Sequence, residues 1–114
     1  MRSKKDKHSG YIIAYTTAEK RADAETMAGA IIDEGLAACV NIVPGLTSLY
    51  KWNGKKVRTK EFLLIIKTHR RALAMLEKKL KALSPYELPE FISIDIVYGS
   101  DDYLQWIYKA VKPR

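Results

Sequence analysis

The sequence of 114 residues predicts an α+β fold in which one antiparallel sheet carries helices on one face. Two observations predict it. Stretches rich in β-branched and aromatic residues alternate with stretches whose apolar residues repeat at helical spacing. The Asn53-Gly54 pair stands between two long β-prone stretches, which is the strongest short signal of a hairpin. Hydrophobic residues make up 47% of the chain, which is enough for one packed core.

The first half of the chain predicts a strand, a helix and a second strand. Residues 11–17, YIIAYTT, predict the first strand, and Gly35 is expected to end the helix that follows. The second strand is expected within residues 35–52. Pro44 lacks an N–H and Gly45 permits a bend, so this strand should be interrupted there. The apolar stripe of the helix consists of Ala24, Met27, Ala28, Ile31 and Ile32.

The second half predicts two more strands and two more helices. The third strand is expected at residues 56–68, with Thr68 as the N-cap of a helix that Pro85 ends. The alternating segment FISIDIVYG, residues 91–99, predicts the fourth strand, and Ser100 is the expected N-cap of the last helix. The apolar stripes of these two helices are Leu73, Leu76, Leu80 and Leu83, and Leu104, Ile107, Tyr108 and Val111.

This β-α-β-β-α-β order with a C-terminal helix is the ferredoxin-like, split β-α-β arrangement. Its sheet has helices on one face only, yet the third strand is apolar on both faces, with Leu63 and Ile65 alternating with Leu64 and Ile66. A sheet that is apolar on both faces needs a second cover. We therefore expect an oligomer in which sheets pack together and the long hairpin reaches a neighbouring subunit. The alternative is that the last helix alone covers the second face.

Composition limits the other properties. The net charge is +7, and the first seven residues contribute +3 of it, so residues 1–9 are expected to form a disordered basic arm before a single domain at residues 10–114. The single cysteine excludes an internal disulfide and suits a reducing compartment. No apolar run has the length of a membrane span. The sequence thus predicts a cytoplasmic protein without a membrane partner.

Three separate stretches resemble the CutA family of divalent-cation tolerance proteins: GLAACVNIVPGLTSLYKWNGK, EFLLIIKT and PYELPEFISIDIVYGSDDYLQW. The resemblance extends over residues 11–111, and the three stretches occur in the family's order. It implies a ferredoxin-like fold, a homotrimer shaped like the PII signalling proteins, and no enzymatic activity or required cofactor. It also implies a role in the response to copper and other divalent metals, with copper binding in some members.

Cys39 is the candidate metal ligand, because thiolates select Cu(I). The alternative is that Cys39 packs as a small hydrophobic residue. Many family members carry His before the Pro-Tyr motif, where this chain has Ser84, and some carry Cys where this chain has Tyr15. Both differences remove good copper ligands. The remaining candidate ligands in the chain are His8, His69, Met27 and Met75, together with carboxylates.

The resemblance also implies a pocket between subunits, at the place where PII proteins bind a small ligand. Lys67, at the end of an apolar strand, is expected to need a carboxylate partner, and Glu90 is the candidate. This pair would belong either to a small-molecule pocket or to a salt bridge that fixes the register of the trimer. The residues assigned to the pocket are Trp52, Glu61, Lys67, Tyr86, Glu90 and Tyr103.

Two other function classes share the fold order. RNA-recognition domains need stacking aromatics on the third strand, but KEFLLIIKT offers only Phe62, so no nucleic-acid partner is expected. Acylphosphatases need a glycine-rich phosphate loop after the first strand, and TTAEKRADAE contains no glycine. The sequence therefore predicts a non-enzymatic homotrimer that responds to divalent metal ions. The alternative is a PII-like small-molecule sensor or a protein-docking scaffold.

Overall fold

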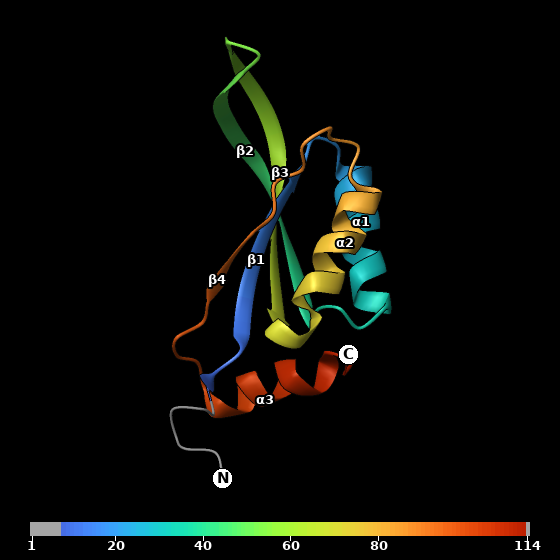
Figure 1. Ribbon diagram of the computed structural model, residues 1–114, viewed down its shortest axis with the longest axis vertical. Helices are drawn as coiled ribbons and strands as arrows, with labels where there is room; N and C mark the ends of the chain where they lie inside the picture. Colours follow the sequence, from blue (N-terminus) through green and yellow to red (C-terminus); the bar gives the residue numbers. More distant parts are fainter. Residues whose placement is uncertain (1–7, 114) are drawn as a thin grey trace.

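A computed structural model describes residues 8–113 and confirms the α+β class (Figure 1). The sheet has the order β2-β3-β1-β4, and every neighbouring pair is antiparallel. Residues 1–7 of the predicted basic arm lie outside the described residues. The elements in chain order are β1 (Tyr11–Ala18), α1 (Arg21–Asp33), β2 (Cys39–Trp52), β3 (Lys55–His69), the 3-10 helix η2 (Arg70–Ala72), α2 (Leu73–Leu83), β4 (Ile92–Asp95) and α3 (Asp101–Ala110).

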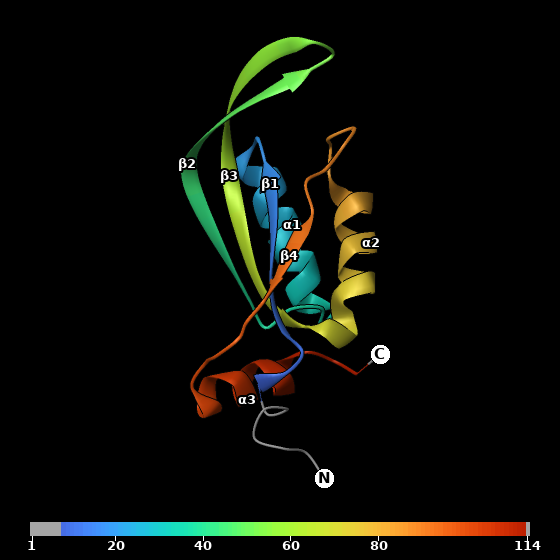
Figure 2. The ribbon, with the colours of Figure 1, turned by 60° about the vertical axis from the view of Figure 1, so that its left-hand side comes forward.

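The core lies between the sheet and the two helices α1 and α2, which cover one face (Figures 1 and 2). The two central strands, β1 and β3, pair from Tyr11↔His69 to Ala18↔Phe62. Because side chains alternate along a strand, one parity of both strands enters the core. The predicted stripe of α1 is confirmed at four positions, but Ile32 is 40% exposed and was wrongly included. The core residues of the central strands include Ile12, Ala14, Leu64 and Ile66.

Gly35 ends α1 as predicted. Its φ of +68° is in the left-handed region, which glycine adopts without steric cost. The Gly35 N–H donates to the Ile32 carbonyl at 3.0 Å, and the Leu36 N–H donates to the Ile31 carbonyl at 2.9 Å. These bonds satisfy the carbonyls that the last helical turn leaves open. The chain is thereby turned back toward the start of β2.

The long hairpin of β2 and β3 also forms as predicted and projects beyond the helices (Figure 1). Its register is regular to Val43↔Leu63, shifts across Pro44 and Gly45, and resumes at Leu46↔Glu61. Pro44, which has no N–H, therefore lies at a point where the β2–β3 hydrogen-bond ladder needs no donor. Asn53 and Gly54 close the hairpin with positive φ values of 52° and 78°, as a two-residue type I′ turn requires.

The predicted start of the second helix is wrong by a few residues. β3 continues to His69, and a 3-10 turn precedes α2, so Thr68 is a strand residue and not the N-cap. His69 is the N-cap of η2, since its Nδ1 accepts a hydrogen bond from the Arg71 N–H at 3.1 Å, and Ala72 is the N-cap of α2. The Thr68 hydroxyl is fully buried and donates to the Leu36 carbonyl at 2.7 Å, which ties β3 to the segment after α1.

The fourth strand is shorter than predicted. Only Ile92–Asp95 forms a strand beside β1, and the last bond to that strand runs from the Ile96 N–H to the Tyr11 carbonyl at 2.9 Å. Val97 and Tyr98 then leave the sheet and are 88% and 77% exposed. The chain turns there because α3 must cross the end of the sheet (Figure 2).

α3 extends the core at this end, and three residues of its predicted stripe are buried: Leu104, Ile107 and Val111. Tyr108 is instead 38% exposed, and its ring lies 4.0 Å from the Arg71 guanidinium. Ser100 is the N-cap residue as predicted, although its side chain makes no capping bond. No helix among residues 8–113 is long and apolar enough to cross a membrane.

We predict that Thr68→Val lowers the free energy of unfolding by about 1–3 kcal/mol, because it leaves the buried Leu36 carbonyl without its donor. Denaturant unfolding at one fixed protein concentration measures the effect. Thr47→Val is the control, since Thr47 is exposed on the same sheet and should change stability little. Equal stability of the Thr68 and Thr47 variants would contradict the assigned role.

Candidate functional site

The sheet face opposite the helices carries apolar rows that nothing covers within the described chain. Strand register places Ile13, Tyr15, Leu63 and Ile65 on this open face, and Ile92 and Ile94 of β4 are 54% and 49% exposed. α3 lies at the end of the sheet and contributes to the helix-side core, so it does not cover this face (Figure 2). The prediction of a sheet apolar on both faces is confirmed, and the alternative that α3 alone covers it is wrong.

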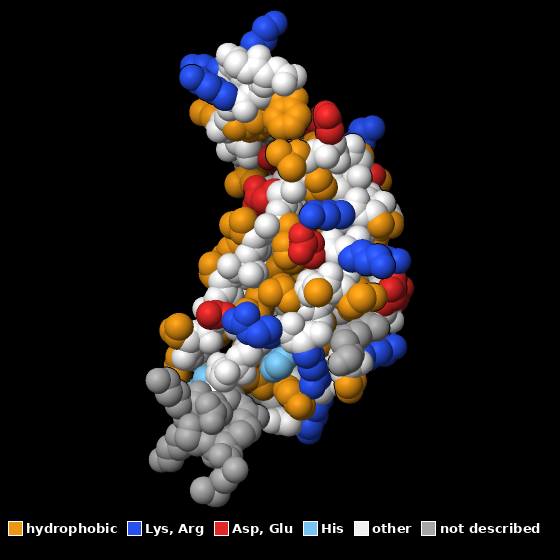
Figure 3. Space-filling view, in the orientation of Figure 1, with side chains coloured by type: hydrophobic (Ala, Val, Ile, Leu, Met, Phe, Trp, Pro, Cys, Tyr) orange, Lys and Arg blue, Asp and Glu red, His pale blue; other side chains and the backbone are white. Residues whose placement is uncertain are grey.

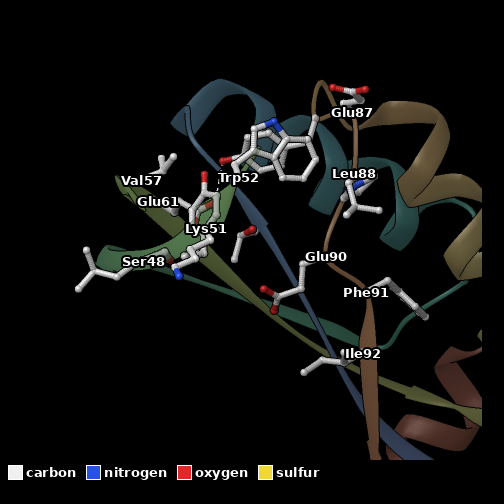
Figure 4. A pocket seen from close by; sticks show the side chains of 15 residues that line it. Ser48, Lys51, Trp52, Val57, Glu61, Glu87, Leu88, Glu90, Phe91 and Ile92 are labelled. Atoms are coloured by element: carbon white, nitrogen blue, oxygen red, sulfur yellow. Dashed lines mark hydrogen bonds between the residues drawn. The ribbon is translucent and has the colours of Figure 1, made fainter. Parts of the chain in front are cut away.

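A cavity of about 920 Å³ lies between the outer half of the hairpin and the segment that leads into β4 (Figure 4). The hairpin contributes residues 48–52, Val57 and Glu61, and the other wall is formed by residues 86–92. Four of the six residues predicted for a pocket line it: Trp52, Glu61, Tyr86 and Glu90.

Glu61 is the most buried charged group of this pocket, with 8% exposure. The Tyr86 hydroxyl donates to its Oε2 at 2.6 Å, and Ser48 and Thr17 also form hydrogen bonds with its carboxylate. Burial alone would raise the pKa of Glu61, but the three hydroxyl bonds together lower it below its usual value. Burial and the bond to Glu61 raise the pKa of Tyr86, so the phenol stays a donor. Glu61 is therefore held as an anion.

Glu90 faces the same space from the opposite wall, and Figure 4 shows its side chain pointing from the β4 segment into the cavity. Burial, and then the charge of Glu61, raise the pKa of Glu90. The backbone around it is fixed, because the Thr16 hydroxyl donates to the Glu90 carbonyl at 2.7 Å. The pocket thus combines an ionised carboxylate, a second carboxylate that resists ionisation, and aromatic walls.

The structure separates Lys67 and Tyr103 from these four residues within one chain. Lys67 stands opposite Cys39 and Ile13 in the sheet, six residues along β3 from Glu61. At the rise of a strand this is roughly 20 Å. No ion pair joins Lys67 to Glu90 among residues 8–113. Tyr103 lies on α3, where its ring packs 5.5 Å from that of Trp106.

Cys39 lies at the start of β2 and is partly buried. Its nearest polar partner is the Asn41 Oδ1, 3.9 Å from the Sγ. In the part of the chain that the structure describes, no group of three or more His, Cys, Asp and Glu side chains gathers as a metal site. His69 caps η2 and packs against the rings of Tyr11 and Tyr108. The described residues therefore place no set of three such ligands around Cys39.

Ser84 and Tyr15, which stand where the family resemblance implies metal ligands in other members, and the candidate ligand His8 all have structural partners. Ser84 accepts a hydrogen bond from the Tyr86 N–H at 3.2 Å, which shapes the turn beside the pocket. Tyr15 stands opposite Ile65 on the open face. His8 pairs with Asp101 at 3.2 Å. These roles place the three side chains in different parts of the molecule.

Among the pocket residues that the sequence did not predict are Thr17 and Ser48, the two that form hydrogen bonds with Glu61 beside Tyr86. Their signal is cross-strand register: Glu61 pairs with Leu46, so Ser48 is its diagonal neighbour on the same face, and Thr17 stands opposite Leu63, two residues from Glu61. The register of β2 could not be deduced beforehand, because the irregularity at Pro44 and Gly45 shifts it just before this point.

An antiparallel split β-α-β sheet with one long hairpin and a pocket beside it defines the class as a ferredoxin-like α+β protein. The family is shown by comparison: residues 12–110 match the model of the CutA1 divalent ion tolerance protein. The chain belongs to this family, as its three motifs indicated.

Individual relatives support the same family. The divalent-cation tolerance protein CutA of Thermus thermophilus is 49% identical over 84 residues, which cover 74% of this chain and 82% of that protein. The chloroplastic CutA of Arabidopsis thaliana is 43% identical over 89% of this chain, which spans only 56% of that relative. Among solved structures, CutA1 from Oryza sativa matches with a TM-score of 0.89 at 40% sequence identity. The match covers 93% of this chain and 97% of the Oryza sativa chain.

We predict that Tyr86→Phe lowers the free energy of unfolding by about 1.5–3 kcal/mol at pH 7, because it removes a hydroxyl bond to a buried anion. Since the pKa of folded Glu61 is lowered, its hydrogen bonds stabilise the fold above pH 4.5 and lose this effect as the pH falls through the folded pKa. The difference in the free energy of unfolding between Tyr86→Phe and wild type should therefore become smaller at acidic pH.

Denaturant unfolding between pH 7 and pH 3 measures this dependence, with Tyr50→Phe as the control. Tyr50 lines the same pocket and is 42% exposed. A Tyr86 effect that stays constant with pH would contradict a charge-linked hydrogen bond.

Proposed function

We propose that this protein acts in the tolerance of divalent metal ions, as a non-enzymatic homotrimer. The observation that carries the proposal is the match of residues 12–110 to the CutA1 divalent ion tolerance family. The relatives in Thermus thermophilus and Escherichia coli are named divalent-cation tolerance proteins. The pocket supports a binding role, since it holds the Glu61 carboxylate with three hydroxyl partners and a second carboxylate, Glu90, on the opposite wall.

The trimer is supported by the open face. Its apolar rows would be taken out of water if the sheets of several copies packed together, at roughly 25 cal/mol for each Å² of apolar surface buried. The hairpin projects past its own helices, so it can reach a neighbouring copy (Figure 1). A PII-like closed trimer uses both features at once.

Two ligand classes are compatible with this assembly. Copper is one, with Cys39 as a soft ligand whose further ligands come from another copy. A small molecule in the pocket is the alternative, supported by the 920 Å³ volume and the fixed Glu61–Tyr86 pair. We propose a cytoplasmic location, although relatives carry the names chloroplastic and periplasmic.

We predict that the gene restores growth on copper or another divalent metal to Escherichia coli that lacks its own relative, which is 34% identical. Growth curves across a metal series measure the effect, with the empty vector as control. If expression restores no tolerance to any metal tested, while the protein accumulates in folded form, the proposed role is wrong.

We predict that the purified full chain binds Cu(I) at a fixed ratio for each assembled particle and that Cys39→Ser removes this binding, because the thiolate is the soft ligand. Titrations of Cu(I) and Cu(II) against wild type and variant measure it, with Ser84→Ala as a matched control. Weak binding that Cys39→Ser leaves unchanged would exclude Cys39 and favour the pocket as the ligand site.

A further inference from the structure

Lys67 and Glu90 are two charged side chains that form no ion pair within residues 8–113. Lys67 is partly buried on the open face, in a row with Cys39, Ile13 and Ile94. Among residues 8–113, no carboxylate pairs with Lys67 and no cation pairs with Glu90. Removing water from the Lys67 ammonium would be costly, because its three neighbours in the row are apolar or weakly polar. Removing water from the Glu90 carboxylate would be costly too, because another carboxylate lies beside it.

Glu90, and not Glu61, is the carboxylate in need of a cation. Glu61 receives hydrogen bonds from the hydroxyls of Tyr86, Ser48 and Thr17. The Glu90 carboxylate has no hydrogen-bond partner within the described residues, and Glu61 opposes its charge. The pocket lining as a whole carries three carboxylates and one lysine, so it has an excess of negative charge. Acidic side chains are visible on the surface where the hairpin meets the body of the molecule (Figure 3).

The two groups cannot meet within one chain. Lys67 is six residues along β3 from Glu61 and does not line the pocket. Yet Lys67 and Glu61 have the same parity on β3, so both face the side of the sheet that another copy would cover. A second copy on this face would cover Lys67 and also the pocket that Glu90 shares with Glu61. Pairing Lys67 with Glu90 across the interface would then offset the loss of hydration of both charges.

We propose that Lys67 of each subunit pairs with Glu90 of the next subunit and completes its pocket, an inference that rests on the homotrimer in the proposed function. The two residues lie at separate places on the chain, so the contact is head-to-tail and not self-complementary. Such contacts repeat around a ring, which closes if the rotation between copies is one third of a turn. The lysine then serves as the missing cation at the acidic wall of each pocket.

Chemical crosslinking tests the contact directly. In a Cys39→Ser background, the double variant Lys67→Cys/Glu90→Cys is treated with a short bis-maleimide after assembly. We expect covalent dimers and trimers on a denaturing gel, because each thiol meets its counterpart on the next subunit. The control Lys60→Cys/Glu90→Cys keeps one thiol and moves the other to an exposed hairpin position, and it should stay uncrosslinked.

Energetic coupling is the second measurement. Lys67→Met and Glu90→Gln should each raise the dissociation constant of the assembly about 30-fold or more, since each leaves one buried charge alone. The double variant should be no weaker than the single variants, because it removes both charges. Lys60→Met is the matched control and should leave assembly unchanged. Sedimentation across a dilution series measures the dissociation constants of wild type and of the four variants.

The outcomes separate the inference from the proposed trimer. If wild type sediments as a monomer, the trimer itself is wrong. If wild type is a trimer but the double cysteine variant stays uncrosslinked, or the two substitutions simply add, the Lys67–Glu90 contact is wrong and the trimer stands. Crosslinking of Lys67→Cys alone would also overturn the contact, because it would place three Lys67 side chains next to one another.

Discussion

Pairing between β1 and β3 is the constraint on which the rest of the structure depends. These strands occupy the centre of the sheet and pair over eight residues without interruption. Their register decides which parity enters the core with α1 and α2 and which remains on the open face. A slip by one residue would move Ile12, Ala14, Leu64 and Ile66 out of the core and expose the polar atoms of Thr68 and Thr16, which now hold the adjoining segments.

The pocket follows from this central pair. Thr16 fixes the segment before β4, and Thr17 reaches Glu61 from the next position on β1. The register shift at Pro44 and Gly45 then sets which residues of β2 lie opposite Glu61. A carboxylate with 8% exposure stays ionised only because hydroxyls from separate strands converge on it.

The proposed ligand site and the proposed assembly both use the open face. Its apolar rows lie on β1, β3 and β4, Cys39 lies on β2, and the pocket is lined by the hairpin and by residues 86–92. A ligand that binds between copies would therefore couple to assembly. The basic tip of the hairpin stays away from this face, and Figure 3 shows its lysine and arginine side chains at one end of the molecule. The pocket lining is acidic, with three carboxylates and one lysine, whereas lysine and arginine side chains occur at the tip and over the rest of the visible surface (Figure 3).

The sequence by itself determined the order of elements, the hairpin turn at Asn53-Gly54, the stop at Gly35 and the family, because each depends on local backbone preferences or on short motifs. It also indicated that the second face of the sheet is apolar, since the side chains of residues 62–66 alternate between the two faces and all five are apolar. Tertiary structure alone decided where β4 ends, because that depends on the crossing of α3. It also kept Thr68 in β3 and made His69 the N-cap of the 3-10 turn that precedes α2. It alone joined Thr17, Ser48, Glu61, Tyr86 and Glu90, since residues far apart in sequence meet only through strand register. The same register separates Lys67 from that pocket within one chain, a relation that no local pattern encodes.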